Sequence, residues 1–172
     1  MKKSCLFIGI LFSSVILFSQ TQDSTLKNTT SSEESLGINF GAGLIRNTIT
    51  PLLQISLNYT NKDSWGVSLN TASYFFFEQT LKVDNTKDFS MYINTFLNAE
   101  FLFRGFFDNS KNNTKNWNGI GIGSLIGRRG DYFTGTTAKL YYIFEYEHIT
   151  ITTELIFTNN FKTVFPGISI VF

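Results

Sequence analysis

Hydrophobic and polar residues alternate along most of the chain after residue 36, and helical periodicity is absent there. A period of two places successive side chains on opposite faces of a β-strand. Clusters rich in Asn, Asp and Lys separate the alternating segments, as is typical of turns. The pattern predicts eight strands, at about residues 37–46, 51–60, 64–78, 88–105, 116–127, 132–146, 147–158 and 164–172.

Each predicted strand has one apolar face and one face of small or polar residues. Residues 53–59, for example, alternate Leu, Ile, Leu and Tyr with Gln, Ser and Asn. The interior of an eight-stranded barrel is only wide enough to be filled by side chains, so the small polar face fits the inside. That face has few Lys or Glu and would make a poor exterior in water. The sequence therefore predicts an all-β, eight-stranded antiparallel up-and-down transmembrane β-barrel over residues 36–172, with its apolar face toward lipid.

Aromatic residues gather near the two ends of the predicted strands. In membrane barrels, aromatic side chains are enriched at the two membrane–water interfaces, which lie near the two ends of the strands. With both ends of the barrel chain in the periplasm, the periplasmic belt comprises Tyr59, Trp65, Phe103, Trp117, Tyr146 and Phe172. The outer belt comprises Phe75, Phe77, Phe89, Phe133 and Phe157. Trp117 is out of phase with Ile120, which predicts a bulge near residues 118–119.

The N-terminal segment has the pattern of an export signal. A basic start at residues 1–3 precedes an apolar run at 6–18, which has the length of a signal-peptide core and is too short for a membrane-spanning helix. Residues 1–19 are therefore predicted to be a signal peptide, with an N-terminal membrane anchor as the alternative. Residues 20–35 are polar and lack periodicity, which predicts a flexible periplasmic leader.

The C-terminal segment ends on an aromatic residue. Its apolar face carries Val164, Ile168, Ile170 and Phe172. Such a strand, in a chain with an export signal, resembles the last strand of bacterial outer-membrane β-barrels. The chain is similar in architecture, though not motif by motif, to small proteins of the OmpX kind and to the transmembrane region of OmpA. In the leader, Asp23-Ser24-Thr25 resembles an O-glycosylation site of some Bacteroidota.

The resemblance implies a location and partners. It implies the cell outer membrane, contact with outer-membrane lipid, and recognition by the barrel-assembly machinery through the C-terminal strand. Composition agrees with a membrane barrel, because charged residues make up 16% of the chain, against about 25% in soluble domains. A formal net charge of +1 argues against nucleic acid as a partner. Cys5 lies within the predicted signal peptide, so no thiol chemistry is expected of the mature chain.

Charged residues within the strands fall on the polar face. An unpaired charge inside a narrow barrel costs several kcal/mol, so these residues are expected to pair. A two-residue turn at Tyr146-Glu147, or a four-residue loop of the same register, sets Lys139 opposite Glu154 and Glu145 opposite His148. The predicted interior ion-pair network comprises Glu100, Arg104, Lys139, Glu145, His148 and Glu154. Its expected role is a structural plug, and the alternative is a gated path for water or ions.

Two patterns raise the question of catalysis or ligand binding. His148 and Thr150, followed by Glu154, faintly resemble the His-x-Ser arrangement of outer-membrane lipid A deacylases. The hydroxyl is Thr, however, and His148 is expected at the periplasmic end, whereas lipid A lies in the outer leaflet. The alternating glycines at 119, 121 and 123 are not a phosphate loop, because no helix follows them. They are expected to make room for Tyr92 or Tyr141. No catalytic residues, no metal ligands and no cofactor are predicted.

The sequence therefore predicts a small outer-membrane barrel with a filled polar interior. Its expected role is structural, or that of an accessory or anchor for an envelope protein partner, without enzymatic activity. Two alternatives remain open at this point: a lipid-modifying membrane enzyme of the deacylase kind, and a secreted lipocalin-like barrel that turns its apolar face inward to hold a ligand.

Overall fold

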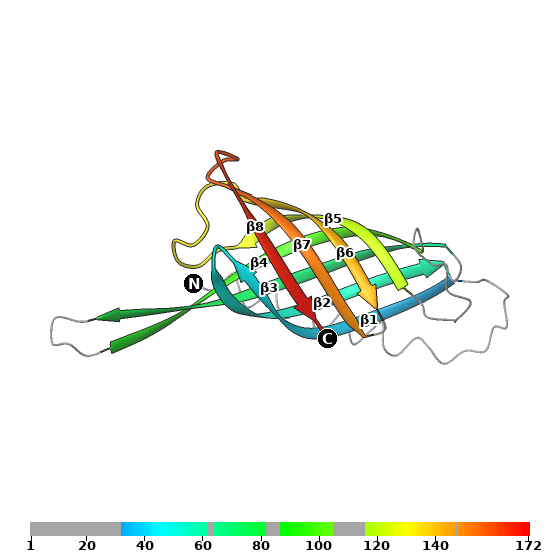
Figure 1. Ribbon diagram of the computed structural model, residues 1–172, viewed down its shortest axis with the longest axis horizontal. Coiled ribbons are helices and arrows are strands. Elements are labelled where there is room, and N and C mark those ends of the chain that lie inside the picture. Colours follow the sequence, from blue (N-terminus) through cyan, green and yellow to red (C-terminus); the bar gives the residue numbers. More distant parts are fainter. Residues whose placement is uncertain (1–31, 62–63, 82–86, 105–115, 147) are drawn as a thin grey trace, which may run out of the picture. The chain divides into compact units, whose positions relative to one another are not determined.

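The computed structural model describes residues 32–61, 64–81, 87–104, 116–146 and 148–172. These residues form eight antiparallel strands that close into one barrel, in which each strand pairs with its neighbours in sequence and the first pairs with the last (Figure 1). The predicted all-β, eight-stranded antiparallel up-and-down barrel is therefore confirmed. The strands are β1 (Ser32–Ile45), β2 (Thr48–Asn61), β3 (Trp65–Leu81), β4 (Lys87–Arg104), β5 (Asn116–Gly127), β6 (Ala138–Tyr146), β7 (Ile149–Thr158) and β8 (Thr163–Val171).

Most of the predicted N-terminal organisation lies outside the described residues. This holds for the signal peptide at 1–19 and for residues 20–31 of the leader. Residues 32–35, expected in the leader, are instead the first residues of β1. In the part of the chain that the structure describes, no helix is long and apolar enough to cross a membrane.

The largest departure from the predicted strands is at the sixth. It was expected to begin at residue 132 but begins at Ala138, and residues 128–137 connect β5 to β6. The predicted bulge is also misplaced: residues 118–119 pair in continuous register with β4, and the register shifts instead between Thr95 and Phe96. The late start of the sixth strand has a physical reason, because residues 128–137 leave the sheet after β5 and place Phe133 in the hydrophobic core.

The two faces of the sheet are sorted by burial. Apolar side chains cover the outside: Ile120 and Ile122 of β5 are 54% and 62% exposed. Between them, Gly121 faces the interior, where a side chain would collide with the Tyr141 ring, since an added Cβ would lie 2.2 Å from Tyr141 Cζ. The expectation that these glycines make room for Tyr141 is confirmed for Gly121 only, because a Cβ on Gly119 would meet Leu102 and one on Gly123 would meet Asn98. The other candidate, Tyr92, instead packs against Gly130.

A long hairpin projects from one end of the barrel. Pairing of β3 with β2 stops at Tyr74, and pairing of β4 with β5 begins only at Thr95. Beyond these points β3 and β4 pair only with each other, as far as Leu81 and Lys87 (Figure 1). We call this the hairpin end, and we call the opposite end, where β8 stops, the C-terminal end.

The barrel is closed between β1 and β8. Their register places Gly41 opposite Val171, and an added Cβ on Gly41 would lie 2.1 Å from the carbonyl oxygen of Ile170. Two further backbone hydrogen bonds join Phe40 and Phe172, at 2.9 and 3.4 Å. A glycine at position 41 thus permits the close approach on which closure depends.

Candidate functional site

The interior of the barrel is filled by side chains that form three layers. The layer at the hairpin end is hydrophobic, and the middle layer is an ion pair with its hydrogen-bond partners. The layer at the C-terminal end combines charged residues with the rings of Tyr141 and Trp117. This interior is the candidate functional site.

The hairpin-end layer is built around Phe133, which is completely buried. Its ring makes edge contacts with Phe76 and Phe96, at centroid distances of 5.8 and 5.5 Å, and stacks on Phe165 at 6.0 Å. Aromatic pairs in such geometries contribute about 0.5–1.5 kcal/mol each beyond their buried area. The fully buried side chains of this layer also include Tyr74, Ile45 and Ile156.

The loop that carries Phe133 is tied to the barrel rim by its neighbour, Tyr132. The Tyr132 hydroxyl donates to the carbonyl of Ile45 at 2.7 Å, and its ring stacks on Phe76 at 3.8 Å. From the β1–β2 turn, Arg46 donates to the carbonyl of Tyr132 at 3.2 Å and lies over the Phe165 ring at 5.1 Å. The loop 128–137 is therefore held as a cap on the hairpin end.

The middle layer centres on the carboxylate of Glu154. Its Oε1 accepts hydrogen bonds from the hydroxyls of Tyr74 at 2.8 Å and Ser169 at 2.7 Å. Its Oε2 pairs with Lys139 Nζ at 3.2 Å, and both side chains are almost completely buried. Lys139 also donates to the Tyr74 hydroxyl at 3.0 Å and lies 4.6 Å from the centre of the Tyr141 ring. A buried ion pair with this many hydrogen bonds meets the condition for compensating its desolvation.

The pairing of β6 with β7 differs from the prediction by two residues. Tyr146 pairs with Ile149, whereas the predicted two-residue turn would have paired Glu145 with His148. Lys139 and Glu154 consequently face each other diagonally, with Glu154 directly opposite Tyr141. The predicted ion pair is present all the same, because a lysine side chain is long enough to reach the diagonal neighbour. The predicted register was wrong.

The layer at the C-terminal end contains the remaining predicted charges. Tyr141 donates to Glu100 Oε1 at 2.7 Å. The Arg104 guanidinium lies over the Trp117 ring at 5.1 Å instead of beside Glu100. Glu145 is half-buried and stands opposite Thr150, not opposite His148. The predicted network of six residues is thus divided into separate contacts.

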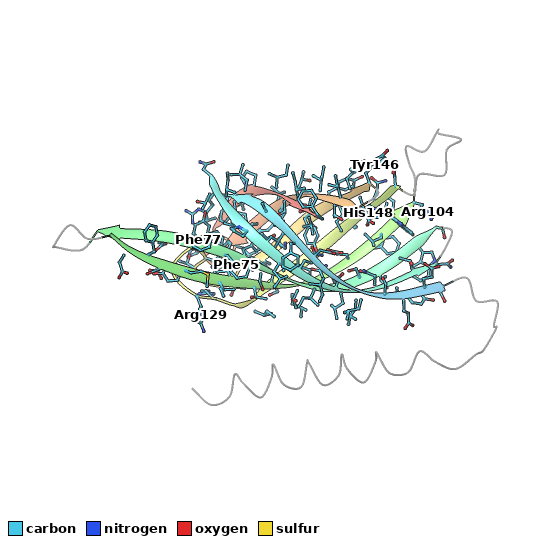
Figure 2. All side chains as sticks on the ribbon, turned by 90° about the horizontal axis from the view of Figure 1, so that it is seen from below. Phe75, Phe77, Arg104, Arg129, Tyr146 and His148 are labelled. Atoms are coloured by element: carbon cyan, nitrogen blue, oxygen red, sulfur yellow. The ribbon has the colours of Figure 1, made fainter. Side chains whose placement is uncertain are left out.

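The aromatic residues predicted as belts lie mostly on the outer face. At the C-terminal end, Tyr59, Trp65, Tyr146 and Phe172 are exposed and Phe103 is half-buried, and at the hairpin end Phe77 and Phe89 are exposed while Phe75 and Phe157 are half-buried. Figure 2 shows Phe75 and Phe77 toward one end and Arg104, Tyr146 and His148 gathered at the other.

Two predicted belt residues were assigned to the wrong face. Phe133 lies inside the barrel, because its loop folds inward. Trp117 packs against the interior residues Leu102, Tyr141 and Ile143. Because β5 has no bulge at 118–119, Trp117 lies on the same face of the strand as the inward-facing glycines two, four and six residues later. This spacing in the sequence could have assigned Trp117 to the interior.

The residues that resemble a deacylase arrangement do not converge. His148 is exposed in the turn between β6 and β7. Glu154 lies six residues further along, about 20 Å at the rise of a strand, and is bound to Lys139, Tyr74 and Ser169. His148 and Glu154 therefore cannot act on the same hydroxyl in this conformation.

The four residues proposed as an assembly signal form one outward row. Val164, Ile168, Ile170 and Phe172 are 50%, 41%, 39% and 66% exposed, whereas the residues between them face inward or are Pro166.

Within residues 32–61, 64–81, 87–104, 116–146 and 148–172, no group of three or more His, Cys, Asp or Glu side chains is placed to hold a metal ion. Comparisons with protein-family models, with curated protein sequences and with solved structures found no match to this chain.

The sequence pattern missed the hydrophobic layer of the interior. The polar face was expected to be small and polar throughout, whereas Tyr74, Phe76, Phe96 and Phe165 fill its hairpin-end half. These four residues alternate with outward-facing apolar residues in β3, β4 and β8, so strand alternation already assigned them to the inner face. Tyr74 and Phe76 were hidden by their outward neighbours Phe75 and Phe77, since an uninterrupted aromatic run has no visible alternation.

Proposed function

We propose that this protein is a small barrel that spans the bacterial outer membrane, with a sealed interior and a structural or anchoring role. One observation carries the proposal: the apolar face is exposed around the barrel while the charged residues Lys139 and Glu154 are buried inside. A soluble monomer rarely exposes a continuous apolar surface of this extent. Hydrocarbon would cover this surface without cost, and the buried charges of Lys139 and Glu154 would remain paired inside the barrel.

The filled interior supports an anchor over a transporter. Phe133, Phe96 and Phe76 occupy the hairpin-end half and the Lys139–Glu154 pair occupies the middle. Eight-stranded barrels have no room for a wide pore once such side chains are in place. The expected partners are outer-membrane lipid, an envelope protein, and the barrel-assembly machinery acting on the outward row of β8.

The same observation favours the membrane over the lipocalin-like alternative. A ligand-carrying barrel keeps large apolar residues around an internal cavity and polar residues in water. Here Ile38, Phe40 and Leu57 are 57–65% exposed, and the interior aromatic residues contact one another directly. No observation in the described residues favours catalysis by His148.

Membrane fractionation combined with gel mobility tests the proposal. The protein is expected in the outer-membrane fraction, and an unboiled sample is expected to migrate faster than a boiled one because the folded barrel stays compact in detergent. Pull-down from the same fraction would identify an envelope partner. Recovery of the protein as a monodisperse species from the periplasm or medium without detergent would refute the proposal and support the lipocalin-like alternative.

A further inference from the structure

A groove of about 500 Å³ indents the outer wall of the barrel across β3 to β7. Its floor consists of small outward-facing side chains, Ala99, Ser124 and Ala138. The strand register aligns Ser124 and Ala138 between the larger Leu97 and Phe157. The groove therefore arises from a drop in side-chain size within an otherwise bulky apolar surface.

The hairpin-end limit of the groove is formed by the β7–β8 turn. Phe161 of this turn lines the groove together with Phe157, and their ring centroids are 6.2 Å apart. Positive φ angles at Asn159, Asn160 and Phe161 hold the turn in a left-handed conformation. The result is an open apolar depression that Phe161 bounds at this end, and its volume lies within the range of about 300–1,000 Å³ typical of sites for one small ligand.

Cationic residues occur in the connections next to the end of the groove that Phe161 forms. The Arg128 guanidinium donates to the carbonyl of Gly135, which packs against Asn160, the residue before Phe161. The backbone of Asn160 is also tied to the same loop, since its N–H donates to the carbonyl of Thr136 at 3.2 Å. Arg128 therefore contacts Gly135, and Gly135 contacts Asn160, which directly precedes the groove residue Phe161.

The surrounding connections keep this end cationic. Residues 128–137 and 159–162 contain the three cations Arg128, Arg129 and Lys162 and one carboxylate, Asp131. A guanidinium has five N–H donors, so the bond to Gly135 leaves donors for a further anion. Phosphate oxygens are the acceptors that arginine binds best, through paired charge-assisted hydrogen bonds.

From this combination we propose that the groove binds one acyl chain of a membrane lipid with a phosphate-bearing anionic headgroup, with the lipid phosphate at Arg128. The apolar floor matches the chain, and the cationic residues next to the Phe161 end match the headgroup. The inference rests on the proposed membrane location, because only there does the groove meet acyl chains at high concentration. It goes beyond that location by assigning a specific lipid site to one side of the barrel.

Native mass spectrometry of the full chain in detergent tests the site. The delipidated protein is mixed with phosphatidylglycerol or phosphatidylcholine that carry identical acyl chains. The wild type is expected to retain one lipid and to prefer phosphatidylglycerol by about fivefold, the effect of one basic residue near an anionic headgroup. Ala99→Phe, which fills the floor, is expected to abolish retention of both lipids, and Ile38→Phe, an outward ring on β1 away from the groove, is expected to leave retention unchanged.

A pair of charge variants tests the placement of the headgroup. Arg128→Gln is expected to remove the preference for phosphatidylglycerol, whereas Arg129→Gln, which changes the net charge equally, is expected to retain it. An equal loss in both variants would refute the assignment of the phosphate to Arg128. Retention in Ala99→Phe equal to that of the wild type, or a dimer that Ala99→Phe dissociates, would refute the lipid site itself. Each variant is first shown to be folded by its heat-modifiable mobility, so that failure of the lipid site is distinguished from failure of the membrane proposal.

Discussion

Glu154 shows how one carboxylate organises the middle of the barrel. It joins β7 to β6 through Lys139, to β3 through Tyr74, and to β8 through Ser169. Strands distant in sequence thus share one buried acceptor, which fixes their relative position as well as neutralising Lys139. The sequence predicted the pair from two charges on inward positions. It could not predict Tyr74 and Ser169 as partners, because contacts across a barrel depend on the whole register.

Removing the lysine tests whether this pair stabilises the barrel. Lys139→Met leaves Glu154 buried without its counter-charge and is expected to lower the free energy of unfolding by about 3–5 kcal/mol. The double variant Lys139→Met/Glu154→Gln removes both charges and is expected to recover most of that loss. Urea titration of the barrel in detergent, followed by gel mobility, measures both, with the exposed Lys162→Met as control. If the double variant loses the sum of the two single losses, the pairing is not a stabilising unit.

Gly121 is a second residue whose identity the interior dictates. An alanine there would place its Cβ against the Tyr141 ring, and Tyr141 is held in place by Glu100. Gly121→Ala is expected to cost about 1–3 kcal/mol through overcrowding, and Gly121→Ala/Tyr141→Leu to regain part of it. Gly127→Ala in the same strand is the matched control, because its Cβ would meet Thr95 only at 3.4 Å. Equal unfolding midpoints for the two glycine variants would contradict the proposed crowding.

At the scale of elements, alternation was sufficient for the strands but not for the connections between them. All eight strands were predicted with their apolar sides outward, because a barrel wall leaves every strand one inner and one outer face. The predicted sixth strand began too early, because residues 132–134 have the alternation typical of a strand. Nothing local indicates that Phe133 turns inward, because its partners Phe76, Phe96 and Phe165 come from three other strands.

The loop 128–137 can be tested as an inserted cap. Phe133→Ala removes the ring at the centre of the hairpin-end layer and is expected to cost about 3–5 kcal/mol. It should also release the loop, so that trypsin cleaves faster after Arg128 and Arg129. Phe89→Ala on the projecting hairpin is the control, because that ring is 72% exposed. Unchanged cleavage and stability in Phe133→Ala would show that the loop does not depend on its buried ring.

For the whole molecule, the decisive property is which medium surrounds the outer wall. The strands expose a nearly continuous apolar surface with aromatic rings toward both ends, and they bury a charged pair inside. Large apolar surfaces exposed to water favour aggregation, and the bilayer that we propose would instead cover this wall with hydrocarbon. Alternation and low charge in the sequence support this proposal, and the structure adds the packing of the interior.

The two tryptophans allow the most direct test, because Trp65 lies on the outer wall and Trp117 in the interior. The barrel is refolded into vesicles whose phospholipids carry bromine on their acyl chains, which quenches indole fluorescence on contact. The Trp117→Phe variant, which retains Trp65, is expected to be strongly quenched, and the Trp65→Phe variant, which retains Trp117, to remain bright. Absence of quenching at Trp65 in folded protein, or equal quenching at both positions, would contradict a barrel whose apolar wall faces lipid.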